Sequence, residues 1–134
     1  IPELKKSVGL TLLEPHINYT NHVFAVLDKD INVKGIAHIT GGGLVENIPR
    51  ILPDDCGVEI QKGSWPILPV FDVMQSLGNV DEDEMFRAFN MGIGMVFIIN
   101  PADMNTVKNA MKYLTEVYEI GSVFSGNKDV TITC

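Results

Sequence analysis

Residues 35–50 read GIAHITGGGLVENIPR, and this stretch decides how the chain folds around its candidate site. An apolar run that holds one histidine leads into three consecutive glycines, and a helix-compatible stretch follows them. The order predicts a strand over 35–39, a glycine loop over 41–43 and a short helix over 44–47. Three glycines forgo side-chain packing and give the backbone access to positive φ. The loop therefore indicates a place where something approaches the backbone closely.

A strand, a glycine loop and a helix start together predict an anion site, because free N–H groups and the helix dipole point the same way. The loop is not a Walker A motif, since no Lys-Ser/Thr follows the glycines, and the Rossmann spacing is absent. Two other interpretations stay open at this point. The triplet could be a plain tight turn, and His38 could be a satisfied core histidine.

The side chains around this loop are the first candidates for function. His38 stands at the carboxyl end of a strand, where ligands bind in α/β folds, and it could relay a proton or bond a ligand. Asn47 and Arg50 follow within two turns and could reach a phosphate, although Arg50 could also be an ordinary surface arginine. We take His38 as the candidate catalytic residue. The candidate phosphate- and substrate-binding residues are Thr40, Gly41, Gly42, Gly43, Asn47 and Arg50.

A second glycine-containing segment, 90–94, makes Asn90 and Gly92 further candidates, although it could equally be a strand with close helix packing. His16 and His22 have no carboxylate at ligand spacing, so we predict no metal site. No nucleophile–base pair and no close carboxylate dyad stands out either. The chain by itself does not supply a complete catalytic set.

Composition narrows the class of protein. The chain has 134 residues and 46% hydrophobic residues, which predicts one globular domain over 1–134. A net charge of −7 without a basic cluster argues against nucleic-acid or membrane-surface binding. No apolar run approaches the roughly 18 residues of a membrane span. Two cysteines without metal-ligand spacing favour a reducing, cytoplasmic compartment.

Alternation of helical and strand patterns predicts an α/β or α+β fold, with helices over a mixed sheet. The patterns also predict the bounds of individual elements. Ser64 is expected to cap a helix that runs through Leu77. Strands are expected at 117–124 and 130–133, with Gly126-Asn127 in the turn between them.

Four motifs stand in register along the chain: HITGGG at 38–43, ENIPR at 46–50, GSWP at 63–66 and FNMGIGM at 89–95. Together they closely resemble the C-terminal domain of the phosphoribosylformylglycinamidine cyclo-ligase family, the aminoimidazole ribonucleotide synthetases of de novo purine biosynthesis. The resemblance runs from about residue 12 to residue 123. Four motifs in order are far more specific than any one of them.

The resemblance implies an enzyme that uses ATP and Mg²⁺ to close formylglycinamidine ribonucleotide into aminoimidazole ribonucleotide. Family members have two domains and are typically homodimers, and the N-terminal half supplies much of the nucleotide and metal site. The C-terminal half is a three-layer α/β/α domain with a mixed sheet and partly ferredoxin-like topology. The active site lies between the halves, and His38 matches a family histidine in that cleft. The glycine triplet, Asn47 and Arg50 match its loop.

The chain begins at Ile1 without an initiator Met, so we expect it to be the C-terminal half, without the N-terminal ATP-binding domain. One motif departs from the family. The usual Pro-Thr-Arg/Lys-Ile-Tyr is Pro-His-Ile-Asn-Tyr at 15–19, so the basic residue's contact is missing or supplied elsewhere, with His16 as a candidate. Two alternatives stay open: another member of the same ATP-using superfamily, and a noncatalytic nucleotide-binding module.

Overall fold

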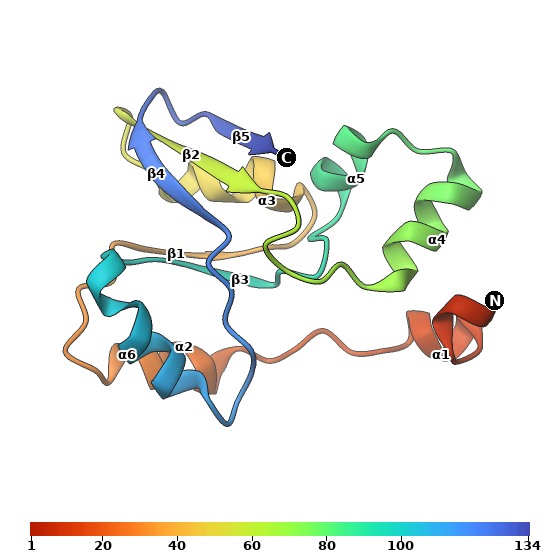
Figure 1. Cartoon of the computed structure of the whole chain (residues 1–134), viewed down its shortest axis with the longest axis horizontal. Helices are drawn as coiled ribbons and strands as arrows, with labels where there is room; N and C mark the ends of the chain where they lie inside the picture. The colour runs from red at the N-terminus through yellow and green to blue at the C-terminus, as the bar shows by residue number, and fades with distance from the viewer.

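The computed structural model describes all residues, 1–134, and its strands form two sheets (Figure 1). In the smaller sheet, β1 (Gly35–His38) pairs antiparallel with β3 (Met95–Ile98). In the larger sheet, β2 (Cys56–Gln61) lies between β4 (Gly121–Ser125), which is antiparallel to it, and β5 (Val130–Thr133), which is parallel. The predicted α+β class is confirmed, and the larger sheet is mixed, as expected.

In the larger sheet β2 is the central strand, with β4 on one side of it and β5 on the other. The sequence predicts the turn after β4, but it does not predict the pairing that results. The chain does reverse direction between β4 and β5, yet the two strands lie on opposite sides of β2 instead of forming a hairpin. The central strand β2 contributes the buried side chains of Val58 and Ile60 to the core.

The helices surround these sheets. The α-helices are α1 (Val8–Leu12), α2 (Thr20–Leu27), α3 (Gly43–Asn47), α4 (Pro69–Gly78), α5 (Glu82–Ala88) and α6 (Met104–Met111). Short 3₁₀ helices span Pro2–Leu4, Ile48–Ile51 and Pro101–Asp103. Helices α2 and α6 pack together beside the β1–β3 pair, whereas α3 packs against α5 near the larger sheet (Figure 1). Helix α1 lies at the end of an extended arm that leads into α2 (Figure 1).

The apolar side chains form two cores. The larger core contains 13 buried residues from both sheets and from α3, α4 and α5, and it holds the strand ends at the candidate site in place. The smaller core consists of Val26, Val107 and Met111, where α2 meets α6. Met104, Val107, Met111 and Leu114 recur at helical spacing, which predicts four core positions, yet Leu114 is exposed because α6 ends at Met111.

The helix expected to begin after Ser64 begins five residues later, at Pro69, so that prediction is wrong. The Ser64 hydroxyl donates to the carbonyl oxygen of Gln61 at 2.7 Å and belongs to the turn after β2. The indole N–H of the buried Trp65 donates to the carbonyl oxygen of Met91 at 2.9 Å. The helix starts late for a local reason: Leu68 is extended, with φ −70° and ψ 138°, and Pro69 occupies the first turn of α4.

Candidate functional site

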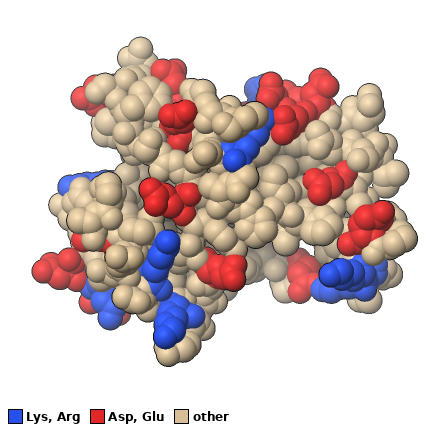
Figure 2. Space-filling view, viewed as in Figure 1, with Lys and Arg blue, Asp and Glu red and all other residues tan.

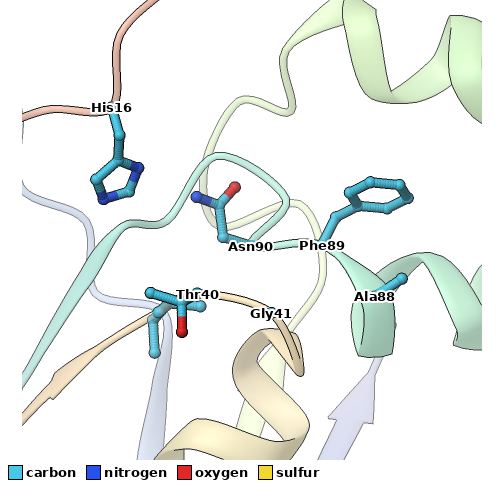
Figure 3. A pocket seen from close by; sticks show the side chains of 7 residues that line it. His16, Thr40, Gly41, Ala88, Phe89 and Asn90 are labelled. Carbon is cyan, nitrogen blue, oxygen red and sulfur yellow. The ribbon is translucent and has the colours of Figure 1, made fainter.

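An open cavity of about 310 Å³ lies where β1 runs into the glycine loop. The backbone N–H of Ile39 donates to the carbonyl oxygen of Gly94 at 2.9 Å and joins the ends of the two glycine-containing segments. The cavity is lined by His16, Ile39, Thr40, Gly41, Ala88, Phe89 and Asn90 (Figure 3). Two segments that the sequence marks separately, at 38–43 and 90–94, therefore meet at one site.

The candidate residues are not equally close to this cavity. Thr40, Gly41 and Asn90 line it. Gly92 lies just outside, where its N–H donates to Asn90 Oδ1 at 3.0 Å and closes a turn. Arg50 is exposed in the 3₁₀ helix after α3 and does not line the cavity.

The three glycines of the loop have different roles. A Cβ at Gly41 would meet no atom within 4 Å, so this glycine leaves open space beside the cavity. Gly42 and Gly43 have φ values of 97° and 56°, and a Cβ at Gly43 would lie 2.6 Å from the carbonyl oxygen of Phe89. Gly42 and Gly43 thus have the backbone conformation of a tight turn, and ligand binding by the three glycines stays a prediction.

The Asn47 side chain stabilises the glycine loop through hydrogen bonds. Its Nδ2 donates to the carbonyl oxygen of Gly43 at 2.8 Å, and longer contacts reach those of Gly41 at 3.3 Å and Thr40 at 3.4 Å. The side chain is only 5% exposed. These bonds turn three carbonyl groups toward Asn47, and the loop shape depends on them. Direct ligand binding by Asn47 stays a prediction.

We expect Asn47→Ala to lower the free energy of unfolding by about 1–3 kcal/mol, because buried carbonyl groups would lose their donor. Urea denaturation followed by circular dichroism measures this loss. Arg50→Ala is the matched control, since Arg50 is exposed close by and its truncation should change stability by less than about 0.5 kcal/mol. An unchanged denaturation midpoint for Asn47→Ala would contradict this role.

All three histidines gather around Tyr19, which no sequence pattern reveals. The Nε2 atoms of His16 and His38 are 2.9 Å apart. The Tyr19 ring lies edge-on to His16, His22 and His38, with centroid distances of 5.6, 5.3 and 6.2 Å. His22 is buried, and its Nδ1 has no hydrogen-bond partner. His38 itself is exposed and contacts the cavity only through His16.

Tyr19 holds this cluster in place. Burial raises the pKa of its hydroxyl, so the phenol stays neutral near pH 7. Its ring lies against Gly94, where a Cβ would come within 2.7 Å of the ring carbons. The absence of a side chain at Gly94 is therefore what lets the tyrosine reach the histidines.

Charges and metal-binding groups are sparse around the cavity. No group of three or more His, Cys, Asp or Glu side chains in the structure could hold a metal ion. Lys and Arg side chains lie among Asp and Glu side chains on the face shown in Figure 2, and they form no basic stripe there. None of the helices combines the length and the apolar character that crossing a membrane requires. The residues that line the cavity include no carboxylate, so this lining does not fit a Mg²⁺ site.

Comparison with known proteins places this geometry in context. The family model described as AIR synthase related protein, C-terminal domain, matches residues 2–133. The chain is 47% identical over 134 residues to the phosphoribosylformylglycinamidine cyclo-ligase of Caldicellulosiruptor saccharolyticus, covering 97% of this chain and 38% of that protein. It is 46% identical over 123 residues to the enzyme of that name from Geobacillus thermodenitrificans, and the match covers 89% of this chain and 34% of that protein. It is 42% identical over 133 residues to the enzyme of that name from Thermoanaerobacter sp., and the match covers 98% of this chain and 39% of that protein.

Proposed function

The chain belongs to the AIR synthase related protein C-terminal domain family, and on that premise we propose that it is the C-terminal half of an ATP-dependent cyclo-ligase. The reaction is the closure of formylglycinamidine ribonucleotide to aminoimidazole ribonucleotide in de novo purine biosynthesis. The observation that carries this proposal is the identity of 42–47% to proteins named for that activity, over nearly the whole chain. The glycine loop and its cavity supply a site of the kind that the reaction needs.

The other half of the site belongs to a domain outside this chain. The chain spans only 34–39% of the length of these relatives. Because the lining of the cavity does not fit a Mg²⁺ site, we assign ATP and Mg²⁺ to the N-terminal domain and derive no step through them here. The proposed partners are that domain, a purine-pathway ribonucleotide and a second copy of the full-length protein. The two free cysteines are compatible with a cytoplasmic location.

Within this chain, the loop is proposed to bind the anionic end of the substrate. The backbone N–H groups of Gly41 and Gly42 donate to no backbone or side-chain acceptor in the structure. The Thr40 hydroxyl and the Asn90 amide border the same cavity. His38 is proposed to transfer a proton, and Arg50 to add a charge-assisted contact once the substrate and the second domain are in place.

The chain alone should show no ATP-dependent ring closure, because its cavity is lined by no carboxylate that could hold Mg²⁺ beside a triphosphate. The two-domain protein that contains it should show turnover with ATP and formylglycinamidine ribonucleotide, measured as formation of aminoimidazole ribonucleotide. Ring closure by the isolated chain would contradict the assignment of ATP and Mg²⁺ binding to the N-terminal domain. Nucleotide binding without turnover by the two-domain protein would favour the noncatalytic module instead.

Binding to the loop can be tested on the chain itself. Addition of inorganic phosphate to ¹⁵N-labelled chain should shift the amide signals of residues 40–45 first. Only part of the proposed site is present, so we expect a dissociation constant of about 1 mM, or roughly −4 kcal/mol. Two-dimensional NMR titration gives both the location and the affinity.

The variant Gly41→Val should abolish these shifts without unfolding the chain, since its side chain would enter open space beside the cavity. Gly42 is unsuitable for this test because its φ of 97° would strain any other residue. Gly9→Ala is the control, since Gly9 also has open space around it and lies on the remote α1. If the amide signals of residues 90–94 shift and those of the loop do not, the loop is only a structural turn.

A further inference from the structure

The contact between His16 and His38 has a chemical requirement. At 2.9 Å the two Nε2 atoms are within hydrogen-bonding distance. A neutral imidazole has one nitrogen that donates and one that accepts, so this bond needs a proton on one Nε2 and a lone pair on the other. The tautomers of the two rings are therefore coupled. Whichever ring donates through Nε2 keeps its Nδ1 as an acceptor.

The two rings also differ in position. His16 lines the cavity together with Thr40 and Asn90, and one of its ring nitrogens points toward Asn90 (Figure 3). His38 is not among the lining residues. Because the Nε2 of His16 is held by His38, the nitrogen left to meet a ligand is Nδ1.

The location of His16 is set by the start of α2. The side-chain oxygen of Asn18 accepts a hydrogen bond from the Thr20 N–H at 3.0 Å, which fixes the chain where the arm becomes helix. The ring contacts of Tyr19 with both histidines hold the pair from one side. Tyr19 and His22 are the other titratable groups of this cluster, and burial keeps the phenol neutral.

We propose that His16 is the ligand-facing member of a two-imidazole relay and that His38 acts through it. In the resting pair, His16 donates from Nε2 and keeps a lone pair on Nδ1, while His38 accepts at Nε2 and carries its proton on Nδ1. A proton leaving the ligand bonds to His16 Nδ1, and the His16 Nε2–H bond breaks as its proton passes to His38 Nε2. His16 ends neutral and His38 ends as imidazolium, so the proton and the charge are both accounted for.

This inference rests on the proposed function for its role in catalysis, but the tautomers can be tested without it. Isolated neutral imidazoles favour the Nε2–H tautomer. In long-range ¹H–¹⁵N spectra of the chain at alkaline pH, His16 should appear as Nε2–H and His38 as Nδ1–H. In His16→Leu, His38 should return to Nε2–H. In His16→Gln, the side-chain amide can donate in place of the ring, so His38 should stay Nδ1–H.

Tyr19→Phe is the matched control, because it keeps the ring contacts and should leave both tautomers unchanged. Two Nε2–H tautomers in the wild-type chain would overturn the pairing. An unchanged His38 spectrum in His16→Leu would overturn it as well. Both results are independent of whether the protein closes a ring.

The relay itself is tested in the two-domain protein. His16→Gln should lower kcat about 100-fold while KM changes little, since the amide keeps the geometry but cannot pass a proton. Wild-type kcat in this variant would overturn the relay. Absence of ring closure in the wild-type protein would instead contradict the proposed function and leave the tautomer result standing.

Discussion

Replacing Gly43 with alanine should leave the chain without a stable fold. The new Cβ would lie 2.6 Å from the carbonyl oxygen of Phe89 and closer still to that of Phe86. Both obstacles are backbone atoms at the end of α5, so no rotamer change relieves the overlap. Gly43 is also buried and has a φ of 56°, which is strained for alanine. We expect a loss above about 4 kcal/mol, a large part of the 5–15 kcal/mol that holds an ordinary domain together.

Circular dichroism and urea denaturation of Gly43→Ala measure this effect. Gly41→Ala is the matched control two residues away, since its Cβ would enter open space and should change stability little. A cooperative transition for Gly43→Ala near the wild-type midpoint would show that α3 and α5 can separate without cost. Such a result would contradict the close packing of the loop on α5.

The second large effect is expected from His38→Ala in the two-domain protein. Loss of a proton-transfer group lowers turnover by roughly 10²–10⁴-fold. His38 is exposed and lies at the end of β1, so its truncation should cost little stability. The same change removes the hydrogen-bond partner of His16, so both members of the pair lose their function together.

Steady-state kinetics of ring closure and the denaturation midpoint of the same preparation separate these two effects. Lys34→Ala serves as the control, because Lys34 is exposed immediately before the same strand. If turnover of His38→Ala stays within a few-fold of wild type, His38 has no part in proton transfer.

Much of the secondary structure and part of the site follow from the sequence alone. The strand over 35–38, the loop and the short helix over 43–47 lie where the apolar run and the glycines predict them. Thr40, Gly41 and Asn90 do line a cavity. These features are encoded locally, since glycine, proline and the period of apolar residues act within a few positions of themselves.

Other features are decided by contacts between segments that are distant in the sequence. Trp65 bonds to the backbone of Met91, 26 residues away, and no local pattern around either residue predicts this contact. Gly42 and Gly43 look identical to Gly41 in the sequence, but only the approach of α5 makes Gly43 indispensable for packing.

The histidine pair is the clearest case. His16 and His38 are 22 residues apart, in an arm and at a strand end, and neither has a local partner that marks it. Their Nε2 atoms meet because Tyr19 packs against Gly94, and Gly94 is held beside Ile39 by the pairing of β1 with β3. The amino-acid sequence determines which residues can carry a proton or expose an amide. The path of the whole chain decides which of them touch. A hydrogen bond requires a separation of about 3 Å, and the number of residues between two positions does not give their distance in space.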